Sequence, residues 1–539
     1  MEHKPCDLVM KGGITSGIVY PRAVCELAKE FRFANIGGTS AGAIAAALTA
    51  AAEYRRQNGS DDGFATLAAL PEWLAKDHNL LRLFQPNDET APLMDVALGW
   101  IEAPRWKAFA TLRALLANFN RFGGVVAAAG VLLIVIAAFA RAPIVTALLV
   151  SAIVAITAIA FVIASIAELV VHALRVLPRN KFGVCSGAGA GALTEWLAER
   201  IDSVAGVDHP LTFGDLAAAG VHLEMMTTNL THGRPYRLPF STKKFLFSEK
   251  EFRELFPKRV VDFMIARSAP RGGLYAFPRA DDLPVVVAAR MSLSFPLLLT
   301  AVPLHAIDFG RRDRDFAPEV CWFSDGGISS NFPVHFFDVP LPRWPTFAIN
   351  LEEHSPRYHE ADQTIYAPSS NVSGILEWWR TIDSLPSFLW SIVETMQNWR
   401  DNMLLRMPGY RDRIAHVLLA PHEGGLNLTM EPQTIDKVAA RGGAAGKALR
   451  ERFGGAGWRN HQWIRFLSFM RALDDAAIEF AEAYDESLLD GSTRLPSYDV
   501  GRERGAMREK VRAFAQLARV RSGRRRPRPR SVLRAVPEV

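Results

Sequence analysis

The first sixty residues repeat one pattern twice, and this pattern restricts the possible folds more than any other feature of the sequence. Each repeat contains a short apolar stretch, a glycine-rich turn and a segment with helical periodicity. These parts occupy residues 7–10, 11–13 and 16–30 in the first repeat, and 31–36, 37–42 and 43–55 in the second. A strand, a glycine turn and a helix in succession predict an α/β fold on a parallel sheet.

Further strands and helices are predicted downstream. Apolar stretches at 221–228, 320–324 and 346–351 predict strands, whereas 375–405 and 458–488 have helical periodicity. The chain has 539 residues, of which 49% are hydrophobic and 22% charged, enough for a large core. Its four cysteines are scattered without a Cys-x-x-Cys pair, which argues against a disulfide framework and a zinc site.

Two uncharged apolar runs follow the second repeat. As helices, residues 122–140 and 144–167 would be about 28 and 36 Å long, and each can cross a bilayer core of roughly 30 Å. Only residues 141–143 separate them, so we expect a tight transmembrane hairpin. The outer flanks carry seven Lys and Arg residues and the turn carries one, which predicts cytoplasmic flanks. A buried hydrophobic hairpin, or one that enters a single leaflet, is the alternative.

The net charge of +6 comes from one end of the chain. Residues 502–539 contain 13 Lys and Arg and three Glu, so the preceding 501 residues carry a net charge of −4. Such a tail can contact anionic headgroups, at about 1 kcal/mol per basic residue near the surface, or it can be a solvated end. Nucleic-acid binding is a poorer interpretation, because the basic run lacks interleaved aromatic residues and a recognisable module.

The segment Gly38-Thr39-Ser40-Ala41-Gly42 matches the G-x-S-x-G pattern of a nucleophile elbow. The pentapeptide alone is common, but here an apolar strand precedes it and a clean helix follows it, as the sharp turn requires. Ser40 would then lie at a helix N-terminus, which favours developing negative charge. We therefore predict Ser40 as a nucleophile, with Gly38 and Gly42 as the glycines of its turn.

The earlier glycine turn, at 11–17, offers the backbone N–H donors that acyl transfer requires for its oxyanion. A phosphate-binding loop is the alternative interpretation. However, the G-x-x-x-x-G-K-[ST] pattern is absent, and G-x-G-x-x-G fails because Ile14 occupies the middle glycine position.

The general base has two candidate types. Asp325, in Asp325-Gly326-Gly327, follows a predicted strand at the edge of the sheet where α/β proteins gather their sites. A carboxylate there can take the serine proton directly. A Ser-Asp-His triad is the alternative, since thirteen histidines are available. The other interpretation of Asp325-Gly326 is a plain turn, which is the most common role of an isolated Asp-Gly.

Several motifs occur in the order found in one enzyme family. These are the early glycine loop, followed by Ile18-Val19-Tyr20-Pro21, the elbow about 25 residues later, 227–235, Ser292-Leu293-Ser294-Phe295-Pro296 and the late Asp-Gly-Gly. The set resembles the patatin-like phospholipases, a family of lipid acyl hydrolases, over roughly residues 6 to 350. The segment after about residue 355 matches nothing in this resemblance.

The resemblance implies a Ser–Asp dyad without histidine. Ser40 would attack the ester and Asp325, in the turn with Gly326 and Gly327, would be the base. The amides of Gly12, Gly13 and Ile14 would hold the oxyanion, and no metal or organic cofactor is implied. The implied activity is hydrolysis of acyl esters of membrane glycerolipids through an acyl-enzyme. The implied fold is a three-layer α/β/α domain with a parallel-type central sheet.

The predicted organisation is a patatin-like domain at 6–355, a two-helix transmembrane hairpin inserted at 122–167, a mostly helical extension at 356–500 and a basic tail at 501–539. The catalytic domain is predicted on the cytoplasmic side of a membrane. The predicted partners are phospholipid substrate and the bilayer, which the hairpin and the basic tail would contact, with no nucleic acid. Two other functions remain open, a catalytically silent lipid-binding or regulatory scaffold and a Ser-His-Asp thioesterase or protease.

Overall fold

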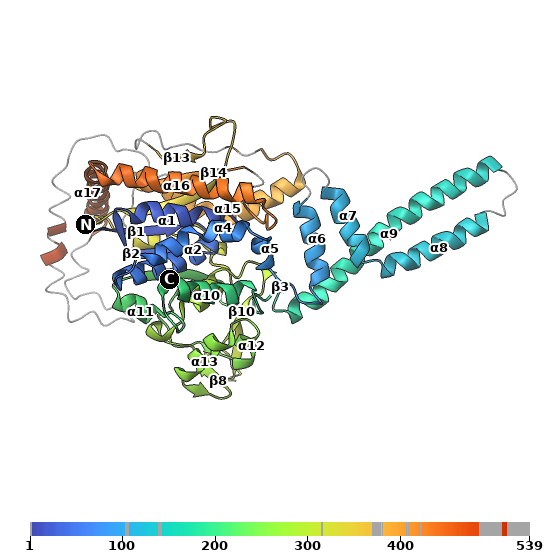
Figure 1. Ribbon diagram of the computed structural model, residues 1–539, viewed down its shortest axis with the longest axis horizontal. Helices are drawn as coiled ribbons and strands as arrows, with labels where there is room; N and C mark the ends of the chain where they lie inside the picture. Colours follow the sequence, from blue (N-terminus) through green and yellow to red (C-terminus); the bar gives the residue numbers. More distant parts are fainter. Residues whose placement is uncertain are drawn as a thin grey trace.

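The computed structural model gives side-chain contacts for most of the chain. It describes residues 3–13, 15–102, 107–137, 143–313, 316–368, 379, 381–405, 407, 409–420, 423–484, 509–511 and 513–514. Ile14, the predicted turn residues 141 and 142, residues 485–500 and nearly all of the basic tail lie outside the described residues. Figure 1 shows a compact α/β body from which a pair of long helices projects.

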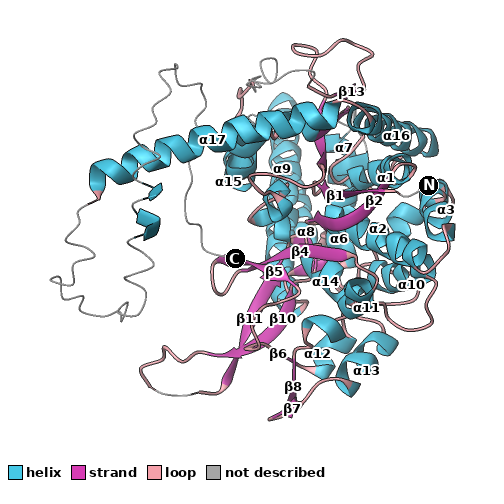
Figure 2. Ribbon diagram, turned by 90° about the vertical axis from the view of Figure 1, so that its left-hand side faces the viewer, coloured by secondary structure: helices cyan, strands magenta, loops and turns pink. Residues whose placement is uncertain are grey.

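A strongly twisted mixed sheet forms the centre of the body (Figure 2). In the described residues its order is β13-β14-β12-β1-β2-β4-β11-β10-β6-β8-β7, with β5 beside β4. The strands are β1 Lys4–Met10, β2 Phe31–Gly38, β4 His222–Asn229, β5 Arg234–Leu238, β6 Leu246–Phe247, β7 Pro270–Arg271, β8 Leu274–Ala276, β10 Val302–Ile307, β11 Pro318–Ser324, β12 Thr346–Glu353, β13 Ile365–Tyr366 and β14 Ile414–Leu419.

The five central strands β14, β12, β1, β2 and β4 are parallel, whereas β11, β10 and the strands beyond them are antiparallel. The predicted α/β fold is therefore present, but the sheet is mixed rather than of wholly parallel type. The reason is that β11 runs antiparallel to β4 and pairs with it only at the carboxyl ends of the two strands. Ser324 lies opposite Thr228, so the carboxyl ends of both strands lie together. The short sheet of β3 Gly183–Cys185 and β9 Leu297–Leu299 is separate.

Helices cover one face of the sheet with a large core. They are α1 Tyr20–Ala28 (after a 3₁₀ turn at Thr15–Val19), α2 Ala41–Gln57, α3 Asp62–Ala68, α4 Leu70–Ala75, α5 Asn79–Arg82, α10 Leu193–Ala205, α11 Phe213–Ala218, α14 Val285–Ser292 and α16 Pro432–Gly454. Side chains alternate across β1, so Leu8 and Met10 enter this core while Val9 enters a smaller core on the other face. Phe332, Val334 and Tyr410 complete the smaller core.

The segment beyond residue 355 takes part in the body. Its strand β14 pairs with β12 in the parallel sheet, and its helix α16 packs on α1. That packing is close because a Cβ on Gly442 would lie 1.8 Å from the Val19 carbonyl oxygen. The predicted boundary at 355 therefore differs from the observed core, which continues into 414–454. The remaining helices of this segment are α15 Leu385–Leu405 and α17 Gly457–Ala483.

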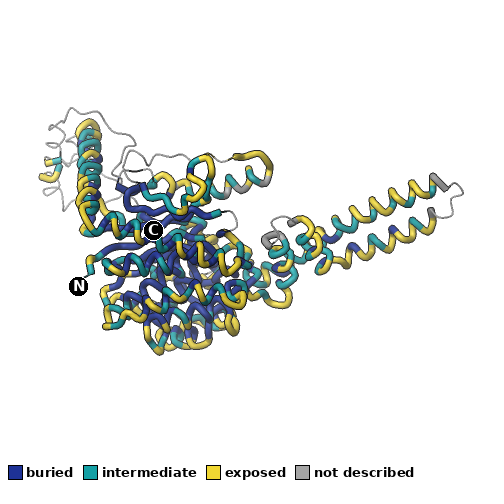
Figure 3. The backbone as a smooth tube through the Cα atoms, turned by 45° about the horizontal axis from the view of Figure 1, so that its top comes forward, coloured by how far each residue is buried: buried dark blue, intermediate teal, exposed yellow. Residues whose placement is uncertain are grey.

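Four helices lie between α5 and β3 in the described residues, namely α6 Ala91–Glu102, α7 Lys107–Asn118, α8 Arg121–Ala137 and α9 Pro143–Arg179. The antiparallel α8 and α9 project from the body, with largely exposed side chains (Figure 3). Within the described residues, one helix, Val145–Arg179, is long and apolar enough to cross a membrane. A second span exists only if α7 and α8, which are bent by 89°, count as one.

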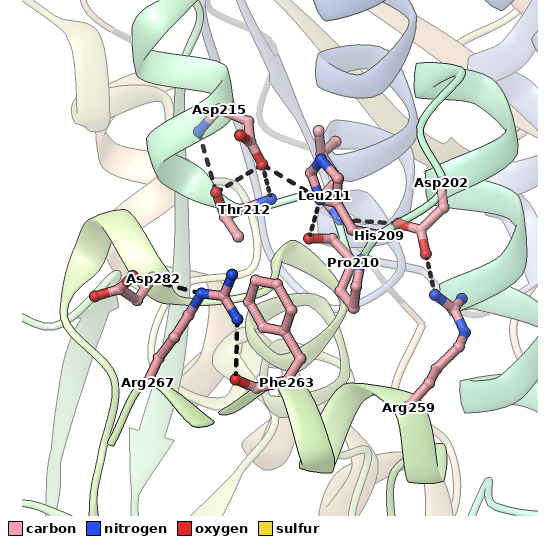
Figure 4. A network of polar contacts seen from close by, with 10 residues as sticks. All are labelled: Asp202, His209, Pro210, Leu211, Thr212, Asp215, Arg259, Phe263, Arg267 and Asp282. Carbon is pink, nitrogen blue, oxygen red and sulfur yellow. Dashed lines mark hydrogen bonds and ion pairs between the residues drawn. The ribbon is translucent and has the colours of Figure 1, made fainter. Parts of the chain in front are cut away.

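An outlying part carries α12 Glu249–Arg253 and α13 Lys258–Ala266 and is tied to the body by polar contacts (Figure 4). Arg259 of α13 forms an ion pair with Asp202 of α10 at 2.5 Å. Asp202 also accepts a hydrogen bond from the Leu211 N–H at 2.9 Å. In Figure 1 this part lies below the body, and Glu254, directly after α12, forms an ion pair with Lys181 near the end of α9.

Candidate active site

Ser40 lies in a sharp turn between β2 and α2. Its φ of 56° and ψ of −131° place a non-glycine residue in a conformation that costs energy. The turn is so tight that a Cβ on Gly38 would lie 2.3 Å from the Gly42 carbonyl oxygen, and one on Gly42 would lie 2.3 Å from the Met10 carbonyl oxygen. The elbow therefore requires glycine at both positions, and the Ser40 N–H donates to Ser292 Oγ at 3.2 Å.

Asp325 follows β11 and is buried beside the carboxyl end of β4. Its own N–H donates to the Ser294 carbonyl at 3.0 Å, and its Oδ1 accepts from the Gly327 N–H at 2.6 Å. A Cβ on Gly326 would lie 2.0 Å from the Met226 carbonyl oxygen, so the turn after Asp325 packs directly on β4. These contacts fix the carboxyl group in one orientation.

The structure brings Ser40 and Asp325 together. Burial raises the pKa of Asp325 to about 7, opposed by the Ser40 side chain, the Gly327 N–H and the Arg290 charge. Asp325 Oδ2 is buried and makes no hydrogen bond within the described residues. Catalytic hydrogen bonds are often long or poorly aligned before substrate binds.

Arg290 of α14 is a site residue that the sequence did not reveal. It is fully buried and donates to the Ser294 hydroxyl at 2.7 Å and to the Thr300 carbonyl at 3.0 Å. Burial lowers its pKa to about 10, and the nearby Cys185 and Asp325 oppose that shift. Arg290 thus holds the Ser294 segment that supports Asp325 and supplies positive charge near the carboxylate.

The predicted oxyanion loop lies against the nucleophile. A Cβ on Gly12 would lie 2.8 Å from Ser40 Cβ, so the two turns are in contact. The Gly12 N–H donates to the Asn331 carbonyl at 2.8 Å and is therefore occupied. The Gly13 N–H has no such partner in the described residues and is the better oxyanion donor of the two. Ile14 lies outside the described residues.

No histidine takes part in the arrangement around Ser40 in the described part of the chain. Neither Ser40 nor Asp325 has a hydrogen bond or ion pair with a histidine there. His305 and Glu251, His416 and Glu352, and His461 and Asp412 pair elsewhere. The described residues also contain no group of three or more His, Cys, Asp or Glu side chains placed to hold a metal ion.

An apolar cavity begins beside the nucleophile. One face of α2 lines it, with Ala41 next to Ser40 and then Ile44, Ala45 and Leu48. Its volume is about 80 Å³, and part of it opens to solvent. Its other walls are largely apolar and come from 15–24, from α3 to α5 and from α10, with Leu293. An apolar lining of this kind suits a hydrocarbon chain.

Comparison with known proteins gives three results. Residues 8–163 match the model of the patatin-like phospholipase family, a range that includes Ser40 and ends before Asp325. A protein of Rhizobium meliloti (strain 1021) named RpoH suppressor is 37% identical, and the alignment covers 90% of this chain and 88% of that protein. That name states no reaction.

Two solved structures are similar at low identity. The type III effector protein ExoU is 15% identical, with a TM-score of 0.28, and the match covers 95% of this chain and 69% of that one. In the heterodimeric ExoU–SpcU complex of Pseudomonas aeruginosa the values are 16%, 0.22, 96% and 66%. TM-scores this low do not establish a common arrangement of the elements.

Proposed function

The chain belongs to the patatin-like phospholipase family, and from this premise we propose that it is a serine hydrolase of membrane glycerolipids. Lipid acyl hydrolysis is the general activity of the family. The observation that carries the finer proposal is the position of Ser40, which is strained, lies beside a buried carboxyl group and directly precedes Ala41, a residue that lines the apolar cavity.

The proposed reaction has two steps. Ser40 Oγ attacks the ester carbonyl carbon as Asp325 takes its proton, and the Gly13 N–H and the positive N-terminus of α2 stabilise the oxyanion. The tetrahedral intermediate then loses the lipid alkoxide, which receives the proton from Asp325. Water next attacks the acyl-serine, Asp325 takes a proton from that water, and the fatty acid leaves as Ser40 regains its proton.

The pKa of Asp325 suits a base in this scheme. A carboxylate with an ordinary pKa would be a poor acceptor for the serine proton, whereas one raised to about 7 is matched to neutral pH. The α2 face fits the acyl part of the substrate. The cavity's two threonine hydroxyls, those of Thr15 and Thr49, already donate to the Gly425 and Ala45 carbonyls.

The membrane part of the proposal rests on α8 and α9. We propose that the pair anchors the enzyme in the bilayer, with the catalytic body on the cytoplasmic side and the basic tail free to touch anionic lipid. Exposed large apolar residues follow one another along α8 and α9, and the most apolar stretch of α9 is not buried by the rest of the protein. Single cysteines introduced before Phe122, near Pro143 and after Lys181 test this topology through their labelling by a membrane-impermeant thiol reagent. The proposed topology predicts equal labelling of the first and last positions, because both flanks lie on the same side.

The test of the function is a lipid analysis with wild type and Ser40→Ala. We expect wild type to release fatty acid from phospholipid vesicles and Ser40→Ala to lose at least about 10³-fold in rate, because members of a catalytic unit fail together. A fluorophosphonate should label wild type at Ser40. Residual activity within tenfold of wild type would reject Ser40 as nucleophile, and absence of labelling would favour the silent scaffold.

A further inference from the structure

Asp401 of α15 is buried, in a segment that the family resemblance does not reach, and it accepts three hydrogen bonds from one turn. Its Oδ1 accepts from the Ser330 hydroxyl at 2.8 Å. Its Oδ2 accepts from the N–H groups of Asn331 and Phe332, both at 2.8 Å. The carboxylate thus fixes three successive residues shortly after the Asp325 turn, about seventy residues earlier in the chain.

The turn that Asp401 holds lies between the two halves of the candidate site. The Asn331 carbonyl accepts the Gly12 N–H, which fixes the oxyanion loop. The Asn331 side chain lies so close to that loop that a Cβ on Gly12 would be 2.2 Å from its Oδ1. The same oxygen would be 2.8 Å from a Cβ on Gly327. Asn331 therefore packs against both the oxyanion loop and the turn of the proposed base.

We propose that Asp401 is a positioning residue for the proposed hydrolysis, because it fixes Asn331 and thereby the distance between the oxyanion loop, Ser40 and Asp325. The inference rests on the proposed function. Asp401 contacts neither the nucleophile nor the base, so its effect passes through the turn at 330–332. Misplacement of reacting groups by about 1 Å can lower a rate by roughly 100-fold.

The side of α15 that carries Asp401 faces the body, and the opposite side is exposed. Large side chains along one side of the helix are exposed, namely Leu385, Phe388, Leu389, Ile392, Met396, Trp399 and Met403. At 100° per residue Asp401 lies on the opposite side, toward the body. Near Asp401, the helix adds Leu404 and Leu405 to the smaller core. This end of the helix is thus held by the three hydrogen bonds to Asp401 and a short apolar contact.

The test compares three variants in the full chain. Asp401→Ala removes all three acceptor bonds. Asp401→Asn keeps the shape, since its oxygen can accept from the two N–H groups and its amide can donate to the Ser330 hydroxyl. Asn402→Ala, at an exposed position next to Asp401 on α15, is the matched control. The rate on a soluble butyrate ester is divided by the fraction of molecules that a fluorophosphonate labels at saturation, so unfolded protein does not count.

We expect Asp401→Ala to lower kcat per labelled site by about 10- to 100-fold with KM within twofold, and Asp401→Asn to restore kcat to within about fivefold of wild type. Amide hydrogen exchange at 326–332 should rise in Asp401→Ala alone. If Asp401→Ala has wild-type kcat per labelled site while Ser40→Ala is inactive, the positioning role is wrong and the function stands. If Ser40→Ala keeps wild-type activity, the function itself fails, and the role of Asp401 falls with it.

Discussion

At the scale of single residues, the site places an acidic group where water cannot solvate its charge. Burial has the largest effect on the pKa of Asp325 and raises it. The Ser40 side chain, the Gly327 N–H and the Arg290 charge lower this pKa, but they offset only part of the rise. The protein therefore accepts a less stable carboxylate in exchange for a stronger base. Active sites commonly carry such perturbed groups, whereas an ion pair placed for stability usually lowers the pKa of its acid.

We predict that Asp325→Asn abolishes hydrolysis as fully as Ser40→Ala and stabilises the fold only at higher pH. The folded pKa of Asp325, about 7, exceeds its ordinary value of 3.8, so the native state binds the proton more tightly than the unfolded chain does. The stability contributed by this proton is complete below about pH 4 and is lost as pH rises through 7. By pH 8 the loss is of the order of 4 kcal/mol, which the neutral asparagine avoids.

Urea denaturation of both proteins at pH 5 and pH 8 measures this effect. The variant should match wild type more closely at pH 5 and exceed it at pH 8, while kcat/KM of wild type should rise with pH up to about 7. Equal gains at both pH values would mean that the raised pKa is not the cause. A mild loss of activity, paired with a severe loss on replacement of a histidine, would move the enzyme to the triad class.

Residues of the site differ in how far the sequence could reveal them. Ser40, Gly38 and Gly42 form a local turn, so their spacing, with an apolar strand before it and a helix after it, predicts the elbow that the structure contains. Asp401 acts through partners about seventy residues earlier in the chain, and Arg290 donates to the distant Ser186 carbonyl as well as to Ser294 and Thr300. No motif in the sequence marks either residue. A buried arginine in an apolar helix, Val285–Ser292, was the one available signal for Arg290.

At the scale of elements, α2 both presents the nucleophile and lines the cavity. Its residues Ala41, Ile44, Ala45 and Leu48 recur at helical spacing on the face that lines the cavity. Each residue along this helix lies about 1.5 Å farther from Ser40. Ala41 and Ala45 are small, and the larger Ile44 and Leu48 alternate with them along the helix. An acyl chain attached at Ser40 would therefore run along this face.

We predict that Ala45→Phe shortens the acyl chain that the enzyme accepts. Ala45 lies four residues beyond Ala41, about 6 Å along the helix, so a butyryl group ends before it and a palmitoyl group has to pass it. The value of kcat/KM for a palmitate ester should fall by about 10- to 100-fold, and that for a butyrate ester should stay within threefold. Ala45→Ser, which adds one small atom, is the control.

Thermal unfolding of Ala45→Phe shows whether the larger ring disturbs the core, which the butyrate rate also monitors. A uniform loss on both esters would show that the ring distorts the elbow rather than the cavity. Unchanged rates on both would place the acyl chain elsewhere.

The elements near the N-terminus were predicted well because each strand and helix follows its own local pattern. The strand β14 was missed, although Ile414–Leu419 is apolar and fully buried. It lies inside a segment whose surroundings are helical, and only its pairing with β12 makes it a strand. Likewise, the fit of α16 on α1 depends on Gly442 and Gly446, small residues that carry no helical signal.

At the scale of the whole molecule, two long helices, α8 and α9, project from the body and expose apolar side chains along most of their length. No residue of the most apolar stretch within Val145–Arg179 is buried against the rest of the protein. The pair is nevertheless well packed against itself, since a Cβ on Gly130 would lie 2.4 Å from Thr157 Oγ1. At the end of the pair nearest the body, the Phe122 N–H of α8 donates to a Glu168 carboxylate oxygen of α9 at 3.1 Å. An apolar surface of this length without a protein partner is expected to enter lipid.

We predict that replacing residues 122–167 with a four-residue Gly-Ser linker separates membrane attachment from catalysis. The linker can span up to about 13 Å, and the contact between Phe122 and Glu168 shows that the two ends are neighbours. The shortened protein should be soluble without detergent and hydrolyse a butyrate ester within threefold of wild type, because the site at Ser40 and Asp325 is built from the body. On phospholipid vesicles its rate should fall at least tenfold.

A second variant shows whether apolarity, rather than the bulk of the hairpin, is responsible. Ile156→Lys with Ile163→Lys keeps both helices but places two exposed positions of α9 under a cost of about 2.5–3.5 kcal/mol each at the centre of a bilayer. It should behave as the shortened protein does in flotation with vesicles. Release of the wild type from membranes by carbonate, or full vesicle activity of either variant, would contradict membrane anchoring by α8 and α9. Loss of butyrate hydrolysis in the shortened protein alone would instead show that the pair supports the catalytic body, as a buried hairpin would.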